Sequence, residues 1–214
     1  MQQMSRKKRE YQARRSEILG AAERLFASKG FHNTTMAEIA QESEFAIGTL
    51  YQFFKNKEDL YYTMVIEKLD LLYSGIGNKV HRFKDSLKKI ESLIKTQLSF
   101  FQDNRDFFAI FIKERGSLEA TVNEDFGEAL RQKYLSFIDL VTQVMLTGIE
   151  QSNLKDLDAR EMAWALLGII NSFVFQWIIN PQKVSLVSKS VVIMDLFLRG
   201  TGDVIKEAQR DKGT

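Results

Sequence analysis

Residues 34–60 read TTMAEIAQESEFAIGTLYQFFKNKEDL. This stretch predicts two short helices joined by a tight turn, with a third helix starting directly afterwards. Thr35 and Glu38 have the Ser/Thr-x-x-Glu spacing of a capping box, which marks a helix start. Polar and basic residues lie on and just after the second short helix: Thr49, Tyr51, Gln52, Lys55 and Lys57. The layout is typical of a helix-turn-helix that binds in a groove of DNA.

Apolar residues recur three or four positions apart on both sides of this stretch, which predicts further helices. Gly30 can end the first helix in a left-handed conformation, and Asn56 can cap the helix that follows the helix-turn-helix. From Asp59 onward no segment has the pattern of a strand. We therefore predict an all-α fold of about nine helices, near residues 15–29, 35–43, 46–54, 56–75, 85–103, 107–116, 124–150, 158–179 and 186–198.

The segment 158–179 is apolar on nearly every side. A helix of this kind must be covered all round. Asn171, Ser172 and Gln176 interrupt its apolar run, which favours a buried helix over a membrane-spanning one. The last predicted helix carries a single apolar stripe, which consists of Val187, Val191, Met194 and Leu198, with Leu186 and Phe197 widening it.

The composition restricts the chemistry that is available. The 214 residues include one Pro, which suits long uninterrupted helices, and no Cys, which excludes disulfides and thiolate metal sites. His32 and His81 are isolated, so we expect no metal site and no cofactor. The basic N-terminus is not followed by an apolar run, so we expect no signal peptide and a cytoplasmic protein.

Positive charge is concentrated at the N-terminal end. Residues 1–57 hold ten Lys or Arg and six Asp or Glu, whereas residues 58–214 hold twenty and twenty-two. A basic end on a nearly neutral chain suits a module that binds a polyanion. Residues 1–14 can be either a frayed, solvated terminus or an arm that contacts DNA phosphates or the minor groove.

The segment TTMAEIAQESEFAIGTLYQFFKNKEDLY resembles the DNA-binding domain of TetR-type bacterial transcriptional repressors, most closely at GTLYQFFKNKEDL. The resemblance implies an N-terminal helix-turn-helix domain with a basic arm, over residues 1–57, and a helical effector-binding and dimerisation domain over residues 58–214. It also implies that the last two long helices pair with those of a second subunit, and that a ligand cavity lies among the middle helices.

The resemblance assigns roles to residues of the helix-turn-helix. It implies phosphate contacts for Thr35, Tyr51 and Lys57, with Lys55 beside them. It implies that Ala46, Ile47, Gly48, Thr49 and Gln52 face base edges. Thr49 and Gln52 can form hydrogen bonds there, and Ile47 can pack on a thymine methyl group. The chain departs from the family pattern at Glu44, where Gly is usual, and at Ala46 and Ile47, where Ser and Lys are common.

Two further sets of residues follow from the resemblance together with the apolar pattern. The expected ligand-binding residues are Phe100, Phe107, Phe108, Phe111, Phe137, Asn171 and Phe175. The expected dimer-interface residues are Trp164, Phe173, Trp177, Val187, Val191, Met194 and Leu198. The phenylalanines of the cluster Phe100, Phe101, Phe107, Phe108 and Phe111 can also be plain core, because sixteen Phe in a helical chain can simply fill space.

The predicted function is a ligand-responsive repressor that binds a palindromic operator as a dimer and is released by a small hydrophobic or amphipathic effector. One alternative is a DNA-binding protein without an effector. The other is a carrier or enzyme for a hydrophobic ligand with a vestigial DNA-binding domain. The chain shows no nucleophile–base pair and no phosphate-binding glycine loop, so we expect that it is not an enzyme.

Overall fold

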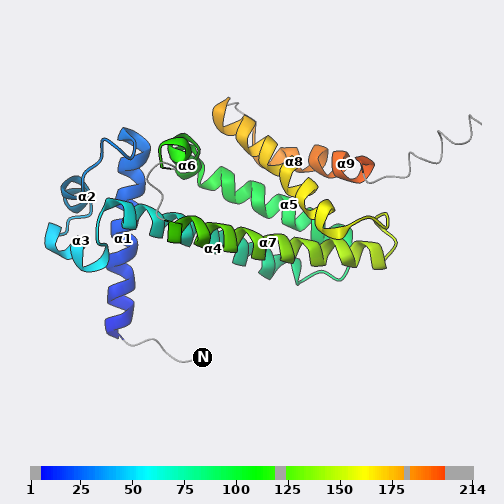
Figure 1. Ribbon diagram of the computed structural model, residues 1–214, viewed down its shortest axis with the longest axis horizontal. Coiled ribbons are helices and arrows are strands. Elements are labelled where there is room, and N and C mark those ends of the chain that lie inside the picture. The colour runs from blue at the N-terminus through cyan, green and yellow to red at the C-terminus, as the bar shows by residue number, and fades with distance from the viewer. Residues whose placement is uncertain (1–5, 119–123, 181–183, 201–214) are drawn as a thin grey trace, which may run out of the picture. The chain divides into compact units, whose positions relative to one another are not determined.

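The computed structural model describes residues 6–118, 124–180 and 184–200. Over these residues the chain forms nine α-helices and one 3₁₀-helix, and no strand (Figure 1). The all-α prediction is confirmed. The elements are α1 (Arg6–Lys29), α2 (Met36–Glu42), α3 (Ile47–Phe53), α4 (Lys57–Val80), α5 (Ser86–Asp103), α6 (Arg105–Leu118), α7 (Glu124–Glu150), α8 (Ala159–Ile179), η1 (Leu186–Lys189) and α9 (Ser190–Gly200).

The chain divides into two compact units. The first comprises the described residues of Met1–Leu69 and Asp106–Gly127, and the second those of Asp70–Arg105 and Glu128–Thr214. The first unit is larger than the segment 1–57 that we expect to bind DNA. It takes in α6 and the first turns of α4, whose buried Leu60, Tyr61 and Met64 complete its core.

The core of the first unit is built around three aromatic rings. Phe26 lies 5.4 Å from Phe31 and 5.9 Å from Tyr61, and Phe31 lies 5.2 Å from Tyr61, between ring centroids. Ile18, on α1, and Leu50, on α3, are fully buried. Ion pairs between Arg24 and Glu42 and between Lys68 and Glu23 join α1 to α2 and to α4.

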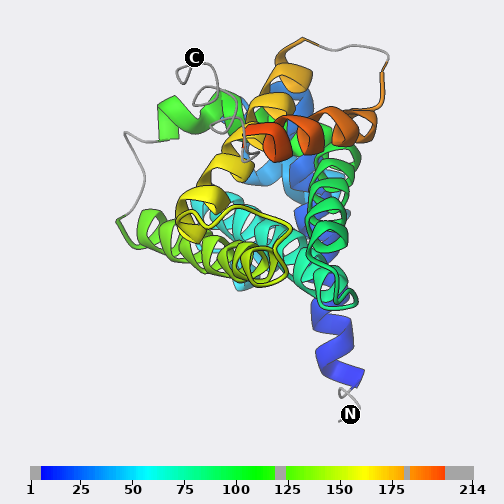
Figure 2. The same ribbon diagram turned by 90° about the vertical axis from the view of Figure 1, so that its right-hand side faces the viewer.

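In the second unit α5 packs against α8, α9 and η1 (Figure 2). The apolar residues of α5 fall on one buried face, and Asp85 caps the helix by accepting a hydrogen bond from the backbone N–H of Lys88. Gln102 fixes the start of η1, because its Oε1 accepts hydrogen bonds of 2.8 Å from Ser185 Oγ and Leu186 N. The buried stripe of η1 and α9 is Leu186, Ser190, Ile193 and Phe197.

The end of α7 is fixed by a Schellman cap. Ser152 has a positive φ of 57°, and its N–H donates to Ile149 O while that of Asn153 donates to Gly148 O. Gln151 then ties this turn to the start of α5, since its Nε2 donates to Lys84 O and its Oε1 accepts from Ser86 N. Leu154 is buried directly against Gly148.

Three helices are longer than the sequence pattern predicts. α4 continues through Gly75 to Val80 and α6 continues past Gly116 to Leu118, because glycine within a helix costs only about 1 kcal/mol. α1 begins at Arg6 instead of Arg15. The expected basic arm is therefore helical from residue 6, which corrects the frayed terminus for residues 6–14, and the expected contact of these residues with DNA stays a prediction. Residues 1–5 lie outside the described chain.

Within the described residues, α8 is long and apolar enough to cross a membrane by length and composition, and 39% of its most apolar window is buried. The core helix of a soluble protein passes the same test. The buried side of α8 includes Leu166, Leu167, Ile170 and Val174, and the other side of this helix is exposed.

Candidate nucleic-acid interface

The turn between α2 and α3 is a second Schellman cap, and Glu44 occupies its left-handed position. Glu44 has a φ of 58°, its N–H donates to Gln41 O, and the N–H of Phe45 donates to Ala40 O. Glycine takes this conformation without steric cost, whereas an L-residue gives up roughly 1 kcal/mol. The turn thus keeps its geometry without the usual glycine.

The start of α2 is held by the predicted capping box. The Glu38 N–H donates to Thr35 Oγ1 at 3.2 Å, and the Thr35 N–H donates to Glu38 Oε2 at 2.8 Å. Lys29 Nζ lies 2.7 Å from Glu38 Oε1. The hydrogen bond from Lys29 has the largest influence on Glu38, followed by those with Thr35. Together they lower the pKa of Glu38 from 4.5 to about 2. The carboxylate therefore stays charged and keeps α2 fixed to the end of α1.

The side of α3 that faces away from the core is exposed. Leu50 and Phe54 are buried, and they attach α3 and the residue after it to the first unit. Tyr51 is 53% exposed and Ile47 is 45% exposed. Ala46, Gly48, Gln52 and Lys55 are also exposed, and Thr49 is half-buried. The structure therefore brings the residues that we expect to face base edges onto one short, accessible helix and its N-cap residue, Ala46.

Two residues with expected phosphate contacts already have partners within the chain. Lys57 Nζ donates to the carbonyl oxygens of Phe31 and Thr34, both at 2.8 Å, and lies 4.4 Å from the centre of the Phe31 ring. The Thr35 hydroxyl lies 3.0 Å from Glu38 Oε2. Lys57 thus fastens the start of α4 to the loop before α2, a role that the sequence pattern does not reveal. The phosphate contacts of both residues stay predictions.

The expected ligand-binding residues are divided between the two units. Phe107 and Phe108 are buried and Phe111 is half-buried in the first unit. In the second unit Phe100 is half-buried, and Phe137 stacks on Tyr73 with ring centroids 4.3 Å apart. Asn171 is hydrogen-bonded to Tyr134, and burial raises the pKa of that tyrosine. Phe175 is 49% exposed.

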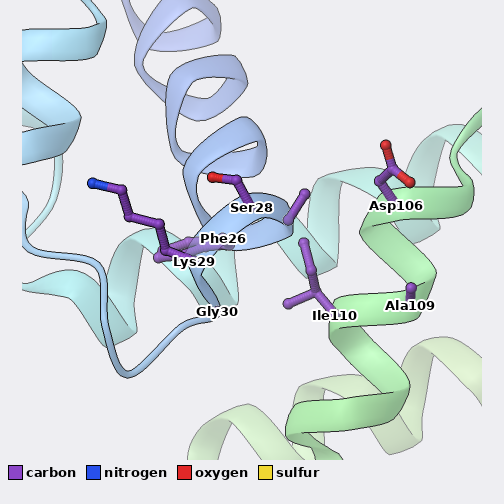
Figure 3. A pocket seen from close by; sticks show the side chains of 8 residues that line it. Phe26, Ser28, Lys29, Gly30, Asp106, Ala109 and Ile110 are labelled. Atoms are coloured by element: carbon purple, nitrogen blue, oxygen red, sulfur yellow. The ribbon is translucent and has the colours of Figure 1, made fainter.

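Two pockets lie elsewhere in the described chain. A pocket of about 200 Å³ lies between the end of α1 and α6, where Ile110 points toward α1 and Lys29 extends away from α6 (Figure 3). This volume is below the range usual for ligand pockets. A more open and mainly apolar pocket of about 520 Å³ is lined by the start of α8 and the end of α9. No residue of the expected ligand-binding set lines either pocket.

The expected dimer-interface residues are all at least partly accessible. Val191 is 75% exposed and Trp164 is 40% exposed, and the other five are half-buried. The structure adds neighbours that the sequence pattern did not assign to this surface: Phe175, Ile179, Val192 and Leu196. Trp164, Gly168, Ser172, Phe175 and Ile179 form an exposed stripe along α8. We call the exposed apolar surface of α8 and α9 the α8–α9 face.

The helix-turn-helix and the helical unit beyond it both match known sequences. Residues 18–62 match the family described as bacterial regulatory proteins, tetR family, and residues 65–200 match the family described as YsiA-like protein, C-terminal region. The chain belongs to the TetR family. It is a helix-turn-helix transcriptional regulator, which confirms the class of function predicted from the sequence.

Similar proteins include a fatty acid metabolism regulator protein of Bacillus subtilis, 24% identical over 86% of this chain and 93% of that protein. The regulator TtgR of Pseudomonas putida is 25% identical over 85% of this chain and 88% of its own length. Among solved structures, FadR of Bacillus subtilis in complex with stearoyl-CoA has a TM-score of 0.74 at 24% identity, and covers 87% of this chain and 99% of that one. At this identity the structural likeness shows the fold.

Proposed function

We propose that this TetR-family regulator binds a palindromic operator as a homodimer, represses transcription there, and is released by an amphipathic effector with a long apolar chain. It acts in the cytoplasm and is not an enzyme. The observation that carries DNA binding is the exposed side of α3. This helix follows α2, which is capped at both of its ends. Preorganised caps hold α3 in one orientation, and this is what insertion into a major groove needs.

Base reading and phosphate binding fall to different residues of this surface. Thr49 and Gln52 offer hydrogen bonds to base edges, and Ile47 offers an apolar contact to a thymine methyl group. Tyr51 and Lys55 are exposed at the end of α3 and contact phosphates. Lys57 and Thr35 do the same where they exchange their internal partners for a phosphate oxygen.

The dimer forms through the α8–α9 face. Val191, Phe175 and Ile179 are large apolar residues that the subunit leaves exposed, and an extended apolar patch marks an interaction surface. Gly168 and Ser172 lie in the middle of the α8 stripe, where small residues let two helices approach closely. A second copy of the same face would cover it, as expected of an isologous two-fold interface.

The effector class is supported by the relatives. A protein named as a regulator of fatty acid metabolism matches most of this chain, and FadR of similar fold was solved with stearoyl-CoA. A long acyl chain attached to a polar group fits the amphipathic effector predicted from the sequence. Such a ligand shifts the protein between two states only as far as it binds one of them more tightly.

The experiment combines footprinting with melting. Footprinting at the promoter of its own gene is expected to protect two half-sites one helical turn apart, or a multiple of a turn. Stearoyl-CoA is expected to raise the melting temperature and to remove the footprint, whereas coenzyme A alone does neither. A footprint that persists at saturating stearoyl-CoA would refute the effector class and leave DNA binding intact. Absence of any protected palindrome would refute the operator.

A further inference from the structure

The first turns of α1 extend beyond the helix-turn-helix as an exposed basic helix. Figure 1 shows α1 running on past α2 and α3 toward the N-terminus. Over Arg6–Arg15 this segment carries one acidic residue, Glu10, and six basic ones: Arg6, Lys7, Lys8, Arg9, Arg14 and Arg15. Sequence periodicity missed this part of the helix because it has almost no apolar residues to show a face.

Tyr11 fixes this basic helix to the end of the recognition helix. Its ring centroid lies 4.6 Å from that of Phe53, the last residue of α3. One turn later Arg15 pairs with Glu67 of α4 and lies 5.6 Å from the centre of the Phe54 ring. Aromatic pairs of this kind add to the stability that their buried area provides. The orientation of the extension is thus set by the same residues that end α3.

The cations of the extension lie on different sides of the helix. Lys7 is four residues before Tyr11 and Arg14 is three residues after it, spacings that place both beside Tyr11 on one face. Arg6 and Arg9 are five and two residues before Tyr11, which turns them away from that face. Arg6 also forms a 2.8 Å ion pair with Glu10. Lys7 and Arg14 are both exposed and lie on the same side of Tyr11, whereas the exposed Lys8, three residues before Tyr11, lies on its other side.

We propose that the first turns of α1 are a second DNA-binding element, in which Lys7 and Arg14 bind backbone phosphates next to the groove that α3 occupies. This proposal rests on DNA binding by α3. An α-helix with side chains is about 10–12 Å across and the minor groove is about 6 Å wide, so a helical extension contacts phosphates and does not enter that groove. Contacts to phosphates add affinity and fix the register without reading sequence.

The composition of the extension favours DNA over a membrane surface. A helix that lies on a membrane needs an apolar face to insert. Tyr11 is the sole large apolar or aromatic residue of Arg6–Arg15, and its ring already packs on Phe53. A dense positive charge beside a recognition helix matches a polyanion that both elements can contact together.

The test uses a duplex selected by the wild-type dimer from a random 60-base-pair library. Affinity is measured at several salt concentrations for wild type, for the variant Lys7→Gln/Arg14→Gln, and for Arg6→Gln/Arg9→Gln, which changes the charge equally on the other sides of the helix. The Lys7/Arg14 pair is expected to lower affinity roughly 10- to 100-fold, by the same factor for single-base variants of the duplex. The dependence of log affinity on log salt should become shallower by about 2 for each subunit. The control pair should change both quantities far less.

A third variant, Tyr11→Ala, keeps the charge and removes the ring contact with Phe53. It is expected to weaken DNA binding while far-UV circular dichroism shows that α1–α3 remain folded. Ethylation of phosphates flanking each half-site should interfere with binding by wild type and not by Lys7→Gln/Arg14→Gln. Equal losses for the two charge pairs, or no loss for either, would overturn the proposal. If the wild-type protein selects no duplex at all, that result would refute DNA binding by α3 as well as by the first turns of α1.

Discussion

The turns that end α2 and α7 have the same backbone design in different surroundings. Each is a Schellman cap with a non-glycine residue, Glu44 or Ser152, in the left-handed position. The α2 turn is set by neighbours in sequence, and α3 starts directly after it. The α7 turn is also tied by Gln151 to the start of α5, more than sixty residues away in the chain. The turn that positions α3 in the DNA-reading region (residues 6–57) is therefore specified by neighbours in sequence, whereas the turn that ends α7 in the regulatory region (residues 58–200) also depends on a distant segment.

The largest effect is expected at the proposed dimer interface, the α8–α9 face. Val191→Asp should raise the dimer dissociation constant by more than about 100-fold, because an unpaired carboxylate in an apolar interface costs several kcal/mol. Light scattering after size-exclusion chromatography measures the change. The matched control is Leu146→Asp, which alters an exposed apolar residue of α7. A Val191→Asp protein that remains dimeric would exclude the α8–α9 face as the interface.

The next effect concerns close packing at the end of α7. A Cβ added at Gly148 would lie 2.6 Å from Leu154 Cδ1 and 2.8 Å from Cγ, so Gly148→Ala must displace a buried side chain. We expect it to lower the free energy of unfolding by about 1–3 kcal/mol in urea titrations. Gly75→Ala, where nothing lies within 4 Å, is the control and should raise it by up to about 1 kcal/mol. If both changes are stabilising, packing against Leu154 does not hold this turn.

A smaller change in the free energy of unfolding is expected at the left-handed positions of the two caps. Glu44→Gly and Ser152→Gly should each raise the free energy of unfolding by roughly 1 kcal/mol, because glycine takes the left-handed conformation without strain. The measurement is urea unfolding of the two single variants and of the double variant, whose gains should add because the sites share no partner. A loss of stability at Ser152 alone would mean that its side chain does more than its backbone conformation indicates.

The smallest effect is a pH dependence in the DNA-reading region. The Glu38 carboxylate has a pKa lowered to about 2, so its contribution to stability is complete above pH 4.5 and is lost as the pH falls toward 2. Glu38→Gln removes that contribution. The difference in unfolding free energy between wild type and this variant should therefore be constant from pH 7 to about 5 and should shrink below it. A difference that stays the same down to pH 3 would contradict the ion pair with Lys29.

How far the sequence could predict each part follows from the same comparison. The capping box of Thr35 and Glu38, the cap at Asn56 and the left-handed Gly30 all depend on a few consecutive residues, and the structure confirms them. The start of α1 was missed because a basic helix lacks an apolar period, and Tyr11 packs on a residue of another helix. The internal partners of Lys57 were missed because they lie more than twenty residues away.

In the regulatory region, the sequence predicts the helices better than it predicts their partners. Its helices were predicted from apolar spacing, but that spacing does not say what covers each apolar face. Phe175 was grouped with the ligand-binding residues, and it lies in the exposed stripe of α8. The stripe of Leu186 and Phe197 packs inside the subunit. Val191, which the sequence pattern places beside it, is the most exposed large apolar residue of the described chain. Only contacts between distant segments separate these two stripes.

The position of the Lys57 ammonium group has a mechanical consequence. It holds two carbonyl groups of the loop that leads into α2, and it belongs to the first turn of α4. A displacement of that turn therefore pulls on the residue that caps α2, and through the short turn at Glu44 on α3. Lys57 therefore couples the position of α4 to the position of α3.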